Sequence, residues 1–346
     1  MKPDGVVRVL EKNVRAGYPV LMVGAPGVGK TDIAKQVAQM TDRDLVVTMP
    51  SVEDPTDSKG FAWPSEDKKS AQFLPYGQLQ KLLTATKPTL WLIDDLGQGS
   101  NAVQAANMQW LLAREVAGHR LPDCVSICSA TNRRQDRANV QSILEPVKSR
   151  FATIIDVEPD LNQWCNDFAL AHGKVSPLIV AYLRYMEGRK ESRLLMHEPT
   201  SDIKNSPSPR TWVNMDKQFK LNHDPRDRLD AFAGAVGRTA AQDFLTFEAL
   251  YSKLENPDLV LTNPETAKIP KQPDHLWVLV SALIARVNEA NFGNFAKYAV
   301  RLKAKEKAEF ATLMLRGAVT QAPEVQNSKD FTRVVTSNAD LMFSDI

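Results

Sequence analysis

The feature that most constrains the fold is the segment GAPGVGKT at 24–31, which directly follows the apolar run PVLMV. Its three glycines allow the backbone to turn sharply and to point its N–H groups at one place. The residues after the turn show helical periodicity. A buried strand, a glycine turn and a helix form the repeating unit of parallel α/β sheets, so the segment predicts a strand at 19–23 and a helix at 32–40.

Further apolar runs alternate with amphipathic stretches up to about residue 155. With the first run they make five in all, at 18–24, 44–50, 89–95, 123–130 and 151–157. This pattern predicts a mostly parallel sheet with helices on both faces. After Pro159 the periodicity is helical only, and NPDLVLTNPETAKIPKQPD at 256–274 reads as a linker. We expect an α/β nucleotide-binding domain at 1–158, an all-α lid domain at 159–258 and a C-terminal helical segment at 275–346.

Composition excludes some classes of protein. The formal net charge of the 346 residues is only +2, and no dense basic block is present, so binding to nucleic acid is not supported. Three cysteines cannot form a disulfide framework and indicate a reducing compartment. No apolar stretch has the length of a membrane span or the form of a secretion signal, so the expectation is a cytoplasmic protein without a membrane segment.

The segment at 24–31 also matches the phosphate-binding pattern G-x-x-x-x-G-K-[ST], between a strand and a helix as that pattern requires. Lys30 is expected to reach the β and γ phosphates of a nucleotide, and the Thr31 hydroxyl to bind Mg²⁺. The sequence therefore predicts ATP with Mg²⁺ as the ligands. The candidate nucleotide-binding residues are Gly24, Ala25, Pro26, Gly27, Val28, Gly29, Lys30, Thr31 and Asp32.

A second part of this site is expected from LWLIDDLG at 90–97, where an apolar strand ends in two carboxylates. Asp94 would hold Mg²⁺ through water, so the candidate metal-binding residues are Thr31 and Asp94. Asp95 would polarise the attacking water. A strand ending in acidic residues is common by itself, but its place after a phosphate-binding loop strengthens the interpretation.

Three further polar residues are candidates for catalysis. Asn132 follows the apolar run at 123–130, at the strand end where ligands of open α/β sheets gather. Arg150 precedes the last apolar run, and Arg210 opens a helical pattern in SPSPRTW. Either arginine could supply positive charge to a transition state, although an isolated exposed arginine is more often a surface group.

These motifs in this order, GAPGVGKT, LWLIDD, SATN, SRF and SPR, resemble those of the AAA+ ATPases and specifically the MoxR-like branch, over roughly residues 5–220. The resemblance implies a P-loop NTPase (AAA+) fold. It assigns Walker A to Lys30 and Thr31, Walker B to Asp94 and Asp95, and sensor 1 to Asn132. It also assigns the arginine finger to Arg150 and sensor 2 to Arg210.

Because the finger of that family acts on the ATP of a neighbouring subunit, the resemblance implies a homo-oligomeric ring, usually a hexamer. Arg133, Arg134 and Arg137 lie near sensor 1 and are rival interface arginines. The resemblance further implies an ATP-driven remodeller of protein substrates, possessing a chaperone-like activity and a partner with a von Willebrand factor A domain. A nucleic-acid loader or translocase, and an ATP-dependent scaffold with little hydrolysis, remain the alternatives.

Asp95 departs from the pattern, because this family usually has Glu there. A carboxylate one methylene shorter would lie farther from the attacking water, so slow turnover is expected.

Two connections also resemble that branch. Residues 51–75 lack clear periodicity and are expected to form a long loop, in which Phe61 and Trp63 would either line a ring channel or pack onto their own domain. Residues 114–124 resemble the hairpin region before sensor 1, and His119 is expected to be a turn or interface residue. Residues 220–346 carry no motif of known chemistry.

Overall fold

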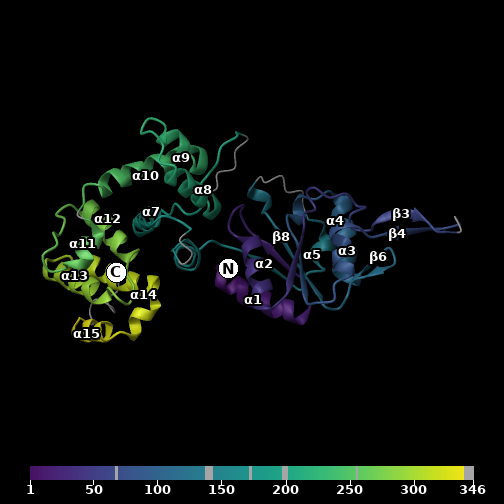
Figure 1. Cartoon of the computed structure of the whole chain (residues 1–346), viewed down its shortest axis with the longest axis horizontal. Coiled ribbons are helices and arrows are strands. Elements are labelled where there is room, and N and C mark those ends of the chain that lie inside the picture. Colours follow the sequence, from purple (N-terminus) through teal and green to yellow (C-terminus); the bar gives the residue numbers. More distant parts are fainter. Residues whose placement is uncertain (67–68, 137–142, 171–173, 197–201, 255, 339–346) are drawn as a thin grey trace. The chain divides into compact units, whose positions relative to one another are not determined.

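The computed structural model describes residues 1–66, 69–136, 143–170, 174–196, 202–254 and 256–338. The chain forms two compact units. The first is built from Met1–Pro159, and the second from Asp160–Met196 and Ile203–Ile346. Figure 1 shows strands only in the first unit and helices throughout the second.

The first unit is organised around a five-stranded sheet in the order β2-β5-β8-β1-β9, with every neighbouring pair parallel. Each strand coincides with one of the five apolar runs, β8 extending one residue beyond its run to Thr131, so the predicted sheet is confirmed. All residues of the two central strands β5 and β8 are buried, as expected for a sheet covered on both faces. The strands are β1 (Val20–Val23), β2 (Asp44–Thr48), β5 (Thr89–Ile93), β8 (Val125–Thr131) and β9 (Thr153–Asp156).

Helices cover both faces of this sheet (Figure 1). On one face lie α1 (Pro3–Ala16) and α2 (Lys30–Met40), and on the other lie α3 (Gly77–Leu83), α4 (Asn101–Ala113) and α5 (Glu145–Lys148). α1 buries Val6, Leu10 and Val14, which recur at helical spacing. Leu82 of α3 and Trp110 of α4 pack with Trp91 of β5 in one hydrophobic core. Short 3₁₀ turns are at Leu96–Gln98 and Arg134–Asp136.

The connection at 51–75 differs from the expected loop. It contains an antiparallel hairpin of β3 (Phe61–Pro64) and β4 (Ala71–Leu74), in which Phe61 pairs with Leu74. All residues of both strands are exposed, so no buried face produced the alternation that identifies a strand in a sequence.

A second hairpin, β6 (Glu115–Val116) with β7 (His119–Arg120), lies in the region expected to carry one. His119 Nε2 is 2.8 Å from the backbone oxygen of Phe73 on β4, so this histidine joins the two hairpins.

All regular elements in the described residues of the second unit are helices (Figure 1). Its helices fall around two hydrophobic cores, one within residues 161–285 and one within 260–325. The first core is rich in rings, with Tyr182 in contact with Trp212, Phe244 and Phe247. The helices are α6 (Leu161–Gln163), a π-helix (Trp164–Leu170), α7 (Pro177–Gly188), α8 (Pro209–Lys220), α9 (Arg228–Val236), α10 (Arg238–Tyr251), α11 (Pro257–Thr262), α12 (Pro273–Ile284), α13 (Phe292–Ala304), α14 (Ala308–Gln321), a 3₁₀ turn (Pro323–Asn327) and α15 (Lys329–Ser337).

The expected linker at 256–274 holds α11 and the start of α12, whereas the segment 263–272 between them is not helical. Pro257 and Pro273 both stand at helix starts, where proline is tolerated, whereas the sequence interpretation took the prolines as marks of a linker. No helix among the described residues is long and apolar enough to cross a membrane.

Candidate nucleotide site at the carboxyl edge of the sheet

The glycine loop at 24–29 leaves the end of β1 and leads directly into α2. The Gly24 N–H donates to the backbone oxygen of Thr131, at the end of the neighbouring strand β8. A Cβ atom on Gly24 would lie 2.8 Å from the backbone oxygen of Val157, so no other residue fits without a shift of the backbone. Gly29 has a φ of 98° and forms the N-cap of α2. The helix N-terminus thereby opens beside the loop, an arrangement that favours anions.

Lys30 is buried, with 7% of its surface exposed. Its Nζ donates to the backbone oxygens of Gly24 and Ala25, at 2.8 and 3.1 Å, and to Oδ1 of Asn132 at 2.7 Å. A buried ammonium group needs such acceptors, because it has lost its hydration. The positive charge is therefore held against the loop, at the place where the phosphate-binding pattern requires it.

Thr31 and Asp94 meet across the site. The Thr31 hydroxyl donates to Oδ2 of Asp94 at 2.7 Å. Asp94 is 8% exposed and follows β5, and its backbone N–H donates to the oxygen of Thr48 at the end of β2. The end of β5 thus brings the Asp94 carboxylate to the first turn of α2.

Asn132 connects the two halves of the site. Its Oδ1 accepts from Lys30, and its Nδ2 donates to Oδ1 of Asp95 at 3.2 Å. Since an ammonium group only donates and a carboxylate only accepts, the two contacts together fix the orientation of the amide. Asp95 has a left-handed backbone with φ of 55°, a conformation that Asp and Asn adopt more readily than most residues.

These residues fit the ligands expected from the sequence. A loop of backbone N–H groups, a helix N-terminus and a lysine suit phosphate oxygens, while a hydroxyl and a carboxylate suit Mg²⁺, which prefers oxygen ligands. Among the residues that the structure describes, no three His, Cys, Asp or Glu side chains form a metal cluster.

The remaining residues of the predicted nucleotide loop lie around this centre. Ala25 and Val28 are buried, whereas Pro26 and Gly27 are partly exposed. Asp32 is exposed in the first turn of α2 and forms an ion pair with Lys35 at 3.4 Å.

Arg150 is not brought to this site. It lies between α5 and β9, and Ala152 donates from its N–H to the oxygen of Pro19, the residue before β1. Gly24, in contrast, follows the other end of β1. The whole length of β1, four residues at about 3.3 Å each, therefore separates the edge that carries Arg150 from the edge that carries the loop. The Nε of Arg150 is buried and has no hydrogen-bond partner among the described residues.

The other arginines differ in their surroundings. Arg133 forms an ion pair with Asp136 at 3.1 Å, while Arg134 is exposed. Arg137 lies outside the described residues. Arg210 is an exposed residue in the first turn of α8 and belongs to the second unit.

Two threonines that the sequence interpretation did not single out support the site. The Thr48 oxygen accepts from Asp94, and the Thr131 hydroxyl accepts from the N–H of Gly97 at 3.3 Å. Both lie at carboxyl ends of strands of the sheet. Their position at strand ends is the signal that could have identified them.

Comparison with known proteins agrees with this geometry. Residues 20–159 match the family model described as ATPase family associated with various cellular activities (AAA). The match spans the loop, both carboxylates and Asn132 and ends with the first unit. The fold is that of a P-loop AAA+ protein, and the first unit contains an AAA ATPase domain, a class of domain that hydrolyses ATP.

Solved structures are more distant. The RuvB Holliday junction branch migration motor of Thermotoga maritima is 17% identical over 75% of this chain and 74% of that chain, with a TM-score of 0.40. A protein of Cytophaga hutchinsonii described as a candidate ATPase is 13% identical over 77% of this chain and 89% of that one, with a TM-score of 0.37. These values say nothing about what this chain binds. No curated protein matches the sequence.

Proposed function

We propose that this chain is a Mg²⁺-dependent ATPase of MoxR type that works as a ring of identical subunits, as a hexamer by resemblance, and remodels partner proteins. The observation that carries the proposal is the hydrogen-bond network that joins Lys30, Asn132 and Asp95, beside the Thr31–Asp94 pair. Three separate segments of the sequence supply these residues, and each carries the motif that resembles the family.

Each residue has a role that follows from its chemistry. The loop N–H groups and Lys30 bind the phosphates of ATP, and Thr31 and Asp94 hold Mg²⁺, which would neutralise charge on the phosphates. Asp95 orients and polarises the attacking water. Asn132, whose amide contacts both Lys30 and Asp95, keeps that carboxylate aligned with the phosphate end of the site.

The position of Arg150 supports the proposed ring. Because β1 separates this residue from the loop of its own unit, an Arg150 that acts on ATP would do so in another copy of the chain. A head-to-tail contact that brings the Arg150 edge of one subunit to the loop edge of the next forms a ring when the rotation between subunits closes. Arg210 and the lid at 159–258 would respond to the same nucleotide.

The β3–β4 hairpin is proposed to bind the protein substrate. Phe61 and Trp63 are 59% and 60% exposed on β3, an unusual degree of exposure for such large rings. A hairpin with exposed aromatic side chains can grip an unfolded segment of a protein substrate. A partner with a von Willebrand factor A domain is proposed by resemblance to the MoxR-like branch only.

A mixing experiment tests the ring. Arg150→Ala and Asp95→Asn are each expected to abolish most ATP hydrolysis. In a 1:1 mixture, about a quarter of the interfaces would combine an intact Asp95 with an intact Arg150 from the neighbour, so activity should return to that extent. Lys148→Ala, two residues from Arg150 and paired with Glu145, is the matched control and should retain activity alone. A mixture no more active than its components would refute action in trans.

A second experiment separates the remodeller from a nucleic-acid machine. ATP hydrolysis is measured with and without single-stranded and duplex DNA at physiological salt. The proposal expects no stimulation, because the chain has little net charge and no dense basic block. A severalfold stimulation that weakens with added salt would replace the remodeller with a loader or translocase.

A further inference from the structure

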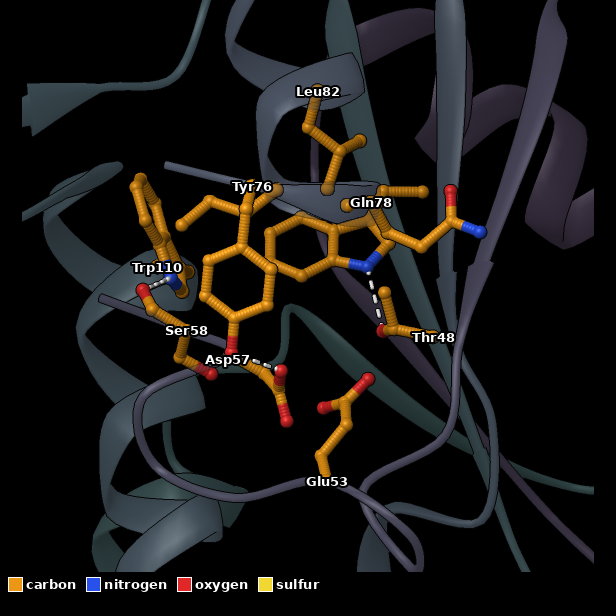
Figure 2. A pocket seen from close by; sticks show the side chains of 11 residues that line it. Thr48, Glu53, Asp57, Ser58, Tyr76, Gln78, Leu82 and Trp110 are labelled. Atoms are coloured by element: carbon orange, nitrogen blue, oxygen red, sulfur yellow. Dashed lines mark hydrogen bonds between the residues drawn. The ribbon is translucent and has the colours of Figure 1, made fainter. Parts of the chain in front are cut away.

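A cavity of about 270 Å³ lies on the face of β5 that α3 and α4 cover, and no residue of the nucleotide loop lines it (Figure 2). Its walls come from the end of β2, the segment that leads into β3, the start of α3, and α4. Aromatic side chains dominate it, with Trp91 from β5, Trp110 from α4 and Tyr76 before α3. Figure 2 shows the rings of Tyr76 and Trp110 near each other, with the carboxylates of Glu53 and Asp57 on one side of them.

Hydrogen bonds hold the aromatic walls in place. The Trp91 Nε1–H donates to the Thr48 hydroxyl at 2.8 Å, and the Trp110 Nε1–H donates to the Ser58 oxygen at 3.1 Å. The indole rings meet edge to face, with centroids 6.1 Å apart. Because both polar edges are occupied, the space between the elements is lined mainly by aromatic and aliphatic carbon.

The two carboxylates at the cavity accept hydrogen bonds from neutral donors. Asp57 accepts from the Tyr76 hydroxyl at 2.5 Å and from the N–H of Asp54, and Glu53 accepts from the N–H of Met49. No ion pair joins Glu53 or Asp57 to a lysine or arginine in the part of the chain that the structure describes. Burial raises the pKa of Glu53, the Met49 N–H lowers it, and the charge of Asp57 raises it further.

We propose that this cavity binds a single organic cation, a guanidinium or alkylammonium group, between the aromatic walls and the carboxylates of Glu53 and Asp57. Aromatic faces attract cations through their quadrupole, and carboxylates add charge-assisted hydrogen bonds. A cation placed there would neutralise two negative charges that otherwise repel each other. Its source is either a free small molecule or an arginine or lysine side chain of a peptide.

The size of the cavity suits one such group. Sites for drug-sized ligands span roughly 300–1,000 Å³, so a space just below that range accommodates a short alkyl chain with its charged head. Leu79 and Leu82 line the same space and suit the alkyl part. The inference does not depend on the proposed function, because binding can be measured without ATP.

The probe is n-butylguanidinium, titrated into the full chain and followed by the indole N–H resonances in NMR spectra. Saturating shifts are expected for Trp91 and Trp110, with a dissociation constant on the order of 1 mM. Trp63, exposed on β3 outside the cavity, serves as the internal reference and should not shift. Neutral n-butylurea has nearly the same shape and should bind at least about tenfold more weakly, because it gains no charge-assisted hydrogen bonds.

Glu53→Gln keeps the size of the side chain and removes its charge, so affinity for n-butylguanidinium should fall about tenfold. Glu66→Gln is the matched control, since Glu66 is an exposed carboxylate in the same connection at 51–75 and does not line the cavity. Unchanged spectra of the remaining resonances would show that Glu53→Gln is folded. Equal binding of the urea, equal loss in both variants, or no shift at Trp91 and Trp110 would each overturn the proposal.

Peptides separate the two sources. Acetyl-Gly-Arg-Gly-amide is compared with the citrulline peptide, which lacks the charge. Binding of the arginine peptide at least as tight as that of n-butylguanidinium supports a protein side chain as the occupant. Binding of n-butylguanidinium alone supports a small molecule, and failure of both cations refutes the site.

Discussion

The Thr31 hydroxyl donates a 2.7 Å hydrogen bond to Oδ2 of Asp94, although 63 positions separate them in the chain. The contact joins the first turn of α2 to the end of β5. Thr31 Oγ1 and Asp94 Oδ2 are also the two oxygens expected to bind Mg²⁺. Substitution at either residue therefore tests whether the Mg²⁺ site is assigned correctly.

Replacing Thr31 with Val tests this assignment. Valine has nearly the same shape and lacks the hydroxyl, so the Mg²⁺ concentration that gives half-maximal ATP hydrolysis should rise by about tenfold or more. The measurement is phosphate release against Mg²⁺ concentration at saturating ATP. Thr31→Ser keeps the hydroxyl and should remain within a fewfold of the wild type. An unchanged Mg²⁺ dependence in Thr31→Val would remove Thr31 from the metal site.

Lys30 is the second test. Its Nζ donates to oxygens of Gly24, Ala25 and Asn132, and the same charge would stabilise the phosphates during hydrolysis. Lys30→Ala should reduce the hydrolysis rate by about a hundredfold to a thousandfold. The matched control is Lys35→Ala, in the same helix but exposed and paired with Asp32. Binding of a fluorescent ATP analogue and phosphate release are measured for both, and normal turnover in Lys30→Ala would exclude the loop as the ATP site.

Asp95 gives a prediction in the opposite direction. If this carboxylate polarises the attacking water but lies too far from it, Asp95→Glu should raise kcat by about tenfold. The left-handed backbone at Asp95 suits Asp better than Glu, so stability should fall by up to about 1 kcal/mol at the same time. Phosphate release and thermal unfolding are measured on the same preparation.

Phosphate release and thermal unfolding together distinguish two explanations. If Asp95→Glu is less stable but no faster, the shorter side chain of Asp95 does not limit the rate. Asp94→Glu, one residue earlier, is the control for a longer carboxylate in general. It should slow hydrolysis, because Asp94 already contacts Thr31 at 2.7 Å and a longer side chain cannot keep that contact in place.

The fold of the first unit could be predicted because the interior strands of its sheet are buried and therefore apolar. The interior strand β5 is buried at every position, and its carboxylates follow directly after its last apolar residue. The proximity of Lys30, Thr31 and Asp94 could be predicted because the carboxyl ends of parallel strands lie at the same edge of a sheet. Those predictions depend on periodicity and on motif order, which a sequence carries directly.

Other features could not be read in this way. The β3–β4 hairpin has no buried face, so its side chains follow no alternation between apolar and polar. The dual contact of Asn132 depends on the direction of one amide, which no pattern encodes. The cavity beside Trp91 depends on several separate segments meeting, and a sequence reveals only that Trp91 belongs to the core.

The cysteines give a prediction that depends on pH. Burial raises the pKa of Cys165 to about 11, although the charge of the nearby Arg184 lowers it. Burial also raises the pKa of Cys128. Since the thiolate is the reactive form, both thiols should resist iodoacetamide at pH 8 in the native protein. Cys124, which is partly exposed, should react first, as mass spectrometry of the labelled peptides would show.

The same shift predicts how stability changes at high pH. Above the unfolded pKa of 9.0 the unfolded chain loses the Cys165 proton, whereas the folded chain keeps it up to about pH 11. The contribution of this thiol to stability is therefore complete below pH 9 and declines between pH 9 and 11, by about 1.4 kcal/mol per pH unit. Thermal unfolding of Cys165→Ala should decline less steeply with pH in that window than wild type. Cys124→Ala serves as the control. Equal slopes for wild type and Cys165→Ala would show that Cys165 titrates alike in both states, contrary to its burial.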